Sequence, residues 1–271
     1  MDYVEFRRVR RALTIYAIFL FIGAIVAVVS FHNASMHNVG GDVIVSIDSG
    51  KPQNLAMREA IARLHIPLAL LLGLAGYCAV VMATMFASSL NKENDGANFV
   101  FVKPISRERL ALQYMAIDLT GIASAFVLAC AAIFGSLAAV GWFGRIVVDA
   151  QWFSVAALGL GIAFMWYGIM QAVTAAYRGK GGALVGWSWA IFGGLSGMSS
   201  ATFLGPVVVA VARVLNVFNP IAYFSGLVSS HGAVRIYSLS GLPIAANVGI
   251  AWSIGLIGCA LATRLWKRVE V

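Results

Sequence analysis

The chain has 271 residues, of which 61% are hydrophobic and only 11% are charged, and its mean hydropathy is +0.87. Soluble domains carry roughly a quarter charged residues, so this composition excludes a soluble protein and indicates one that is embedded in lipid. The formal net charge of +8 does not require nucleic acid as a partner, because Lys and Arg accumulate in the cytoplasmic loops of membrane proteins.

The N-terminal segment 1–12 is rich in arginine and precedes a long apolar run. Its aromatic side chains could lie on lipid while the arginines meet headgroups, so the segment is either an amphipathic interfacial helix or a simple stop-transfer anchor. The apolar run is too long for the core of a signal peptide, and we expect it to be retained. The residues of this pattern are Tyr3, Phe6, Arg7, Arg8, Arg10 and Arg11.

Six apolar segments reach the roughly 20 residues that a spanning helix needs. We therefore expect an all-α bundle, a single transmembrane domain over residues 1–271, with two spans in 13–88 and spans three to six in 115–266. The predicted spans are residues 13–31, 66–88, 115–140, 152–173, 182–200 and 243–266.

The segment 32–65 is the longest predicted outer loop. Residues 39–52 contain alternating Val and Ile, which predicts a short strand pair. Residues 57–64 have the pattern of a short helix that leads into the second span. The role of this loop is left open by the sequence.

The segment 201–228 is apolar enough for a seventh span, but Pro206 and Pro220 interrupt it and Arg213 lies in its middle. Broken backbone at membrane depth is tolerated only where protein or water covers it. We expect a broken, re-entrant or interfacial element, with another full span as the alternative. Arg213 could line the outer part of a transport pathway or extend to the surface.

Most of the 19 Lys and Arg residues fall on the inner side if six spans start from an inner N-terminus. This asymmetry predicts that both termini are cytoplasmic, and a seventh span would place the basic C-terminal tail outside. We expect a multi-pass protein of the inner (cytoplasmic) membrane of a prokaryote.

Motifs for covalent chemistry are missing from the sequence. It contains no P-loop, no HExxH and no GxSxG, and RGKGG at 178–182 is typical of a basic turn. The 4 histidines have no metal-ligand spacing, and the 3 cysteines lie singly inside apolar segments. We expect no catalytic residue, no metal and no cofactor in this chain.

Asp118 is the clearest charged residue inside a predicted span. Charge inside a membrane often marks a functional site. Asp118 could face a polar cavity or pair with a base such as Arg107 or Arg178, but its place near the cytoplasmic end favours a solvated interfacial carboxylate. Asp118 and Arg213 are the candidates for a transport pathway.

Small and polar residues inside the predicted spans indicate helix packing. Pairs with small-xxx-small spacing let helices approach closely and could also serve a dimer. Scattered polar residues could form hydrogen bonds between helices. The small pairs are Gly182 and Gly186, Gly193 and Gly197, and Gly255 and Cys259; the polar residues are Gln113, Thr120, Ser124, Gln171 and Thr174.

The inner segment 91–110 joins the second and third spans. Pro104 interrupts any helix before it, and Ser106 is a favourable N-cap with Glu108 in the first turn, so a helix is predicted to start at Arg107. The preceding stretch contains the apolar run FVFV, which is too short to span. It could lie as a short helix on the membrane surface and contact a protein partner.

This segment resembles the permease subunits of type-two ABC exporters. The similarity rests on a Glu, a Gly three residues later, an apolar patch and a Pro-x-Ser-Arg run that leads into the third span. The six-span layout, the basic N-terminus and the broken element before the last span also fit, so the resemblance covers most of the chain. The matching residues are Glu93, Gly96, Pro104, Ser106 and Arg107, and Asn219–Pro220 with Tyr223 is similar to the family's Asn/Ser-Pro-x-x-Tyr.

The resemblance implies that segment 91–110 is a coupling helix that docks on a separate ATPase subunit. That partner would bind ATP and Mg, and its hydrolysis would drive alternating access in a complex of two permease copies, identical or different, with two ATPases. The substrate is not implied. The implied contact residues are Glu93, Asp95, Gly96, Phe99, Phe101, Lys103, Pro104, Ser106 and Arg107.

The alternative is a stand-alone secondary transporter or an intramembrane enzyme. A secondary transporter usually needs midplane carboxylates or broken helices in matched repeats, for which Asp118 is the main support. An enzyme would need a nucleophile with a base, or metal ligands, inside the bundle. The sequence offers no such set.

Overall fold

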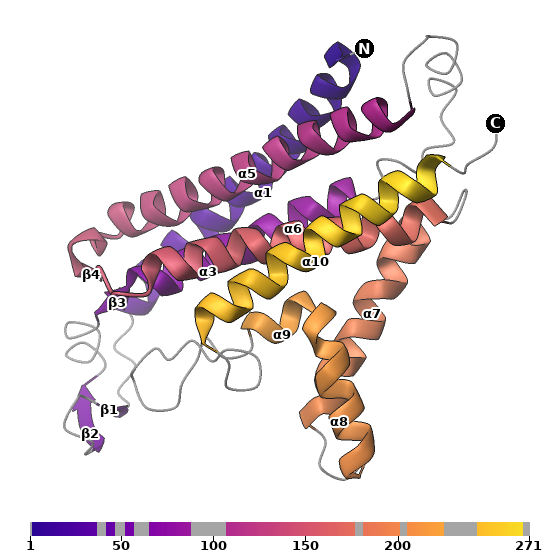
Figure 1. Ribbon diagram of the computed structural model, residues 1–271. Coiled ribbons are helices and arrows are strands. Elements are labelled where there is room, and N and C mark those ends of the chain that lie inside the picture. Colours follow the sequence, from indigo (N-terminus) through magenta and orange to yellow (C-terminus); the bar gives the residue numbers. More distant parts are fainter. Residues whose placement is uncertain are drawn as a thin grey trace.

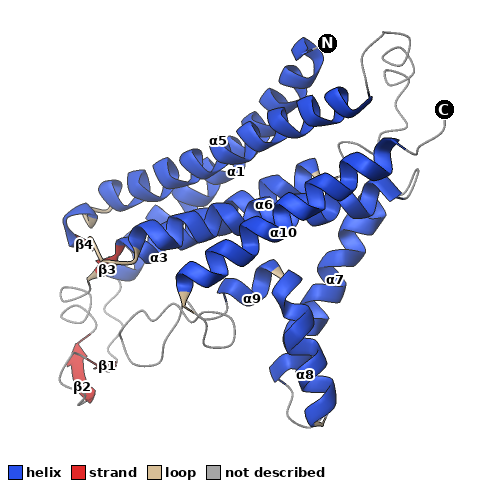
Figure 2. Ribbon diagram, viewed as in Figure 1, coloured by secondary structure: helices blue, strands red, loops and turns tan. Residues whose placement is uncertain are grey.

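The computed structural model describes residues 2–36, 42–46, 52–56, 65–87, 107–176, 181–200, 205–224 and 243–267. These residues are almost all helical (Figure 2). The helices are α1 (Asp2–Met36), α3 (Leu68–Phe86), α5 (Arg107–Ala139), α6 (Trp152–Ala176), α7 (Gly181–Ser200), α8 (Pro206–Leu215), α9 (Pro220–Phe224) and α10 (Ile244–Lys267), with 3-10 turns η2 (Phe143–Arg145) and η4 (Asn216–Phe218). The strands are β1 (Asp42–Ser46), β2 (Pro52–Ala56), β3 (Ile66–Pro67) and β4 (Ile146–Val147).

Within the described residues, five helices are long and apolar enough to cross a membrane: α1, α3, α5, α6 and α10. Each coincides with a predicted span, so the expectation of a helical, multi-pass membrane protein is confirmed at this level. The remaining predicted span, 182–200, forms α7, a helix of 20 residues. Its many Gly and Ser residues leave it without a long stretch as hydropathic as those of the other five, so six spans stay a prediction.

The N-terminal region forms one continuous helix. A separate interfacial helix over residues 1–12 was one interpretation of the sequence, but α1 runs without a break from Asp2 to Met36. At 1.5 Å per residue its 35 residues measure about 52 Å, more than the ~30 Å hydrocarbon core. The arginine-rich first turns can therefore extend beyond the apolar layer as part of the first spanning helix.

The bundle has two layers (Figure 1). In the figure α1 and α5 lie side by side along one flank of α3, α6 and α10, and α6 packs on both α3 and α10. Most of the spanning parts of α3 and α6 are buried, whereas few residues of α1 and α5 are. The core of the molecule is therefore centred on α6.

Glycines allow α6 to approach its two neighbours closely. A Cβ placed on Gly76 of α3 would lie 2.5 Å from the Cα of Gly159 on α6, and a Cβ on Gly168 of α6 would lie 3.0 Å from the Cα of Gly255 on α10. Gly255 was one of the small residues that the sequence indicated for packing, and it does lie at such a crossing.

The glycine pairs of α7 do not have this role within the chain. A Cβ on Gly182, Gly186, Gly193 or Gly197 would meet no described atom within 4 Å. The expectation that these pairs bring α7 close to another helix of the same chain is therefore wrong for the part of the molecule that the structure describes. Spacing alone could not show which glycines face a neighbouring helix.

The two ends of the bundle differ. The start of α1, the start of α5 and the end of α10 lie together at one end in Figure 1, and the β1–β2 pair lies at the other. A strand pair does form in the outer loop: β1 and β2 are antiparallel, with Asp42 opposite Ala56. Only β1 lies within the predicted stretch 39–52, because β2 begins at its last residue, Pro52. The predicted helix over 57–64 lies outside the described residues.

The element before the last span is broken, as predicted. Pro206 and Pro220 are the first residues of α8 and α9, where a missing N–H costs nothing. Gly205 turns the chain into α8 with a φ of 85°, a conformation that side chains disfavour. The ten residues of α8 reach only about 15 Å, so this helix alone is too short for a seventh full span.

Candidate functional site

The predicted coupling segment connects two described helix ends. Helix α3 ends at Phe86, and α5 begins at Arg107, as the N-cap pattern predicted. Both ends lie at the same end of the bundle as the start of α1 (Figure 1). The other contact residues of the prediction lie outside the described residues: Glu93, Asp95, Gly96, Phe99, Phe101, Lys103, Pro104 and Ser106.

Asp118 lies in the interior with 0% of its surface exposed. Arg8 of α1 forms a hydrogen-bonded ion pair with its Oδ1, and the Tyr167 hydroxyl of α6 donates to its Oδ2 at 3.0 Å. A buried carboxylate is tolerated only when paired and hydrogen-bonded in this way. The interpretation as a solvated interfacial carboxylate is therefore wrong. We call Arg8, Asp118 and Tyr167 the Asp118 cluster.

A base that the sequence did not suggest pairs with Asp118: Arg8, which is 110 positions away in the sequence. The suggested partners, the side chains of Arg107 and Arg178, lie outside what the structure describes. The continuous α1 carries Arg8 inward beside α5, and only 18% of its side chain is exposed. Its guanidinium also lies 5.2 Å from the ring centroid of Phe86, which is within the range of a cation–π contact.

Side chains of α6 hold the end of α3. Gln171 Nε2 donates to the carbonyl oxygen of Phe86 at 2.7 Å, and Thr174 Oγ1 donates to that of Ala87 at 3.0 Å. These carbonyls belong to the last turn of α3, where no helical donor remains. We call Phe86, Ala87, Gln171 and Thr174 the α3 anchor. The predicted interhelical role of Gln171 and Thr174 is confirmed, whereas Thr120 and Ser124 bond to their own helix.

The Asp118 cluster and the α3 anchor meet at Phe86. Through these contacts α1, α3, α5 and α6 are joined where the chain leaves α3 toward the predicted coupling segment. Nearer the middle of the bundle, Trp166 Nε1 of α6 donates to Thr84 Oγ1 of α3 at 2.9 Å. The ring of Trp166 contacts Trp189 of α7 at a tilt, with centroids 4.8 Å apart, and Phe192 of α7 edge to face, with centroids 5.6 Å apart. Helix α7 therefore packs on the same part of the core.

Asn219 fastens the broken element to α7. Its Nδ2, which carries two hydrogens, lies within hydrogen-bond distance of three acceptors: the carbonyl oxygen of Phe192 at 2.9 Å, Ser196 Oγ at 2.8 Å and Asn216 Oδ1 at 2.8 Å. Its Oδ1 accepts the N–H of Ile221 at 3.0 Å, as the N-cap of α9. The Asn-Pro-x-x-Tyr run is thus a structural joint.

Tyr223 completes this joint. Its hydroxyl donates to the carbonyl of Val217 in η4 at 2.8 Å, so α9 is tied back to the preceding turn. Burial raises the pKa of Tyr223 to about 12, and the phenol therefore remains a donor at physiological pH.

Substitution of Asn219 by alanine is expected to loosen the α8–α9 element, because the change removes the side-chain hydrogen bonds that join Asn219 to α7, η4 and α9. We expect a loss of about 2 kcal/mol of local stability, seen as faster amide hydrogen exchange over 206–224. Arg213→Ala, an exposed change on α8, is the control. Equal exchange in the two variants would show that Asn219 is not the joint.

Arg213 and Asp118 do not come together. Arg213 lies exposed in the last turn of α8, a helix that packs on α7, whereas Asp118 is enclosed by α1, α5 and α6. A common lining of one pathway by these two residues, as the sequence suggested, has no support in this arrangement. Among the residues that the structure describes, no group of three His, Cys, Asp or Glu side chains could hold a metal ion.

Comparison with protein-family models, with curated proteins and with solved structures gives no match.

Proposed function

We propose that the chain is the permease half of an ABC exporter. A separate ATPase subunit docks on residues 93–107, and ATP hydrolysis there, with Mg, drives alternating access that moves a substrate out of the cell. Two permease copies and two ATPases form the complex, and this chain carries no ATP site of its own. The residue pattern of the 93–107 segment is the starting point of this proposal.

The observation that carries the proposal furthest is the way α3 ends. The α3 anchor and the Asp118 cluster tie the last turn of α3 to α1, α5 and α6 through buried polar contacts. A displacement of the segment that follows Ala87 is therefore passed to several spanning helices at once, because coupling travels through contiguous packed and hydrogen-bonded groups. A partner that contacts the segment differently in its two nucleotide states could thus bias the permease.

The broken element before α10 is a second support. The Asn-Pro-x-x-Tyr run that resembled the exporter family forms the joint between α7, η4 and α9, so its residues have a defined structural purpose here. A short, interrupted helix pair before the last span is also part of the layout that the resemblance implies.

A secondary transporter is favoured only by the buried charge of Asp118. That carboxylate already accepts from Arg8 and Tyr167. A cargo cation or proton would have to replace Arg8, which would cost the fold a buried ion pair. The exporter hypothesis is therefore preferred, because it needs Asp118 only as a structural charge that holds Arg8.

The proposal is tested by co-purification. The chain, tagged at its C-terminus and extracted gently from its native membrane, is expected to bring down a P-loop ATPase that mass spectrometry identifies. Glu93→Ala and Arg107→Ala are expected to lower its recovery by about tenfold, the loss of roughly 1.4 kcal/mol of binding.

Lys51→Ala, in the predicted outer loop, is the matched control and is expected to leave recovery unchanged. Transport by the isolated chain without any ATPase would overturn the proposal and favour the stand-alone transporter.

A further inference from the structure

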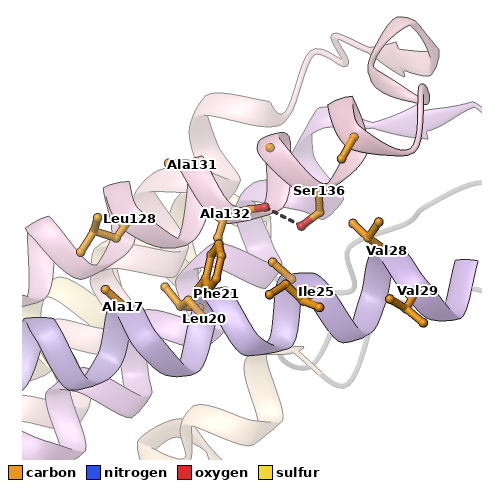
Figure 3. A pocket seen from close by; sticks show the side chains of 13 residues that line it. Ala17, Leu20, Phe21, Ile25, Val28, Val29, Leu128, Ala131, Ala132 and Ser136 are labelled. Carbon is orange, nitrogen blue, oxygen red and sulfur yellow. Dashed lines mark hydrogen bonds between the residues drawn. The ribbon is translucent and has the colours of Figure 1, made fainter.

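A groove lies between α1 and α5, in the halves of these helices that are farther from the N-terminus (Figure 3). Its volume is about 540 Å³, which is within the ~300–1,000 Å³ range of ligand sites. Its lining includes Phe21, Ile25 and Val29 of α1, and Leu128, Ala132 and Gly135 of α5.

The lining offers almost no polar group to a ligand. The hydroxyl of Ser136 is turned back to its own helix and donates to the carbonyl of Ala132 at 2.7 Å, as the dashed line in Figure 3 marks. A ligand with polar groups would have to bury them without hydrogen bonds, which is costly. The occupant must therefore be apolar and slender enough for the space between two helices.

The groove lies at the depth of the lipid chains. Both walls belong to helices that can span a membrane, and its lining residues fall inside their apolar windows. Lining side chains such as Phe21 and Val29 remain about half to two-thirds exposed, at 66% and 51%. The groove is thus open to whatever surrounds α1 and α5, and that surrounding is hydrocarbon.

The length of the groove fits one acyl chain. The lined part of α5, from Leu128 to Ala139, measures about 16 Å along the helix axis. This is close to half of the ~30 Å thickness of the hydrocarbon core. Half of the core is the distance that an acyl chain spans from its own leaflet.

Positive charge lies just beyond the end of the groove. After α5 ends at Ala139, the chain turns through Trp142 to Arg145, whose guanidinium lies 5.2 Å from the Trp142 ring centroid. Tryptophan is typical of the membrane interface, and arginine is a strong partner for phosphate. Arg145 and Trp142 therefore lie near the position of a lipid headgroup whose acyl chain occupies the groove.

We propose that the α1–α5 groove binds one acyl chain of an anionic phospholipid, with the headgroup phosphate held at Arg145. This site does not depend on the exporter proposal, because it requires only that α1 and α5 span the membrane. A second copy of the chain seated in the groove is the competing occupant and is one of the outcomes of the test.

The test uses the full chain in vesicles of phosphatidylcholine and phosphatidylglycerol. A trace of phosphatidylglycerol carries a photoactivatable group on one acyl chain, and the adducts are mapped by mass spectrometry. In wild type we expect adducts concentrated on residues 17–29 and 128–139, above those on the exposed α10 residues Leu256 and Ile257.

Gly135→Leu fills the groove. A Cβ on Gly135 meets no atom within 4 Å, so the new side chain can start into the groove without a backbone clash. We expect roughly tenfold fewer adducts in the groove, because several apolar contacts are replaced by the new side chain. Gly23→Leu is the matched control, since Gly23 is equally open on α1 but does not line the groove.

The headgroup contact has its own variant. Arg145→Gln is expected to abolish the preference of the groove for labelled phosphatidylglycerol over labelled phosphatidylcholine. Equal numbers of adducts in wild type, Gly135→Leu and Gly23→Leu, each with an unchanged melting temperature, would overturn the proposal. The adducts would then report contact with bulk lipid and not a binding site. Chain-to-chain cross-links at 17–29 in place of lipid adducts would overturn it in favour of a second copy.

Discussion

Replacement of Asp118 by asparagine is expected to lower the free energy of unfolding by about 3 kcal/mol. The partly buried guanidinium of Arg8 would lose the carboxylate that neutralises it, while most of its side chain stays shielded from water. The Tyr167 hydroxyl could still donate to the amide oxygen of the new asparagine. The loss of unfolding free energy therefore reports the missing negative charge and not a change in side-chain shape. Thermal unfolding in lipid nanodiscs, followed by tryptophan fluorescence, measures the change.

Two further variants separate the ion pair from other effects. Arg8→Met combined with Asp118→Leu removes both charges, and we expect it to recover most of the loss, because apolar replacements of a buried pair are often neutral. Arg10→Ala, exposed on the same helix, is expected to stay within about 0.5 kcal/mol of wild type. A double variant as unstable as Asp118→Asn would contradict the pairing account.

Replacement of Gly168 by alanine is expected to cost about 2 to 3 kcal/mol. A Cβ at this position would lie 3.0 Å from the Cα of Gly255 and closer still to its carbonyl oxygen, so α6 and α10 would have to separate. Backbone cannot give way as a flexible side chain can. The same nanodisc unfolding experiment measures this effect.

Gly186→Ala is the control for the effect of glycine itself. Gly186 lies in a helix, and a Cβ there meets nothing within 4 Å, so alanine should stabilise α7 by up to about 1 kcal/mol. Destabilisation by both changes to a similar extent would mean that the close approach at Gly168 is not what matters.

These contacts divide the molecule into a firm centre and attached parts. Helices α3, α6 and α10 cross at glycines and move least easily against one another. Helix α1 is joined to α5 and α6 by the Asp118 cluster, beside the apolar contacts of Val9 and Tyr16, and Asn219 adds hydrogen bonds between α7 and the α8–α9 element. We therefore expect conformational change to occur at the Asp118 cluster and at Asn219, where a few polar contacts can be exchanged. The glycine crossings of α3, α6 and α10 are expected to move less.

The long elements could be predicted from the sequence because their signals are local. Roughly 20 apolar residues in a row specify a span wherever they occur, and Pro206 and Pro220 begin new helices because a proline has no N–H to donate. The start of α5 at Arg107 was predicted from Ser106, because serine is a residue type favoured just before a helix. The five apolar spans, the broken element and the β1–β2 pair were predictable for these reasons.

The joints could not be predicted because they depend on which helix faces which. Arg8 was read as one of several headgroup-binding arginines, and no local signal distinguishes it from Arg10. The glycines that matter, such as Gly159 and Gly168, lie on the face of α6 toward its neighbours, whereas the better-spaced glycines of α7 face open space. Composition fixes neither the rotation of a helix nor its partner.

The central claim is that a separate ATPase works through the segment that follows α3. It is tested most directly by ATP hydrolysis in lipid vesicles, measured on the material that co-purifies with the tagged chain. The account predicts hydrolysis with wild type and with Lys51→Ala, and its loss with Glu93→Ala and Arg107→Ala. No hydrolysis with wild type, or the same hydrolysis with all four proteins, would contradict the claim.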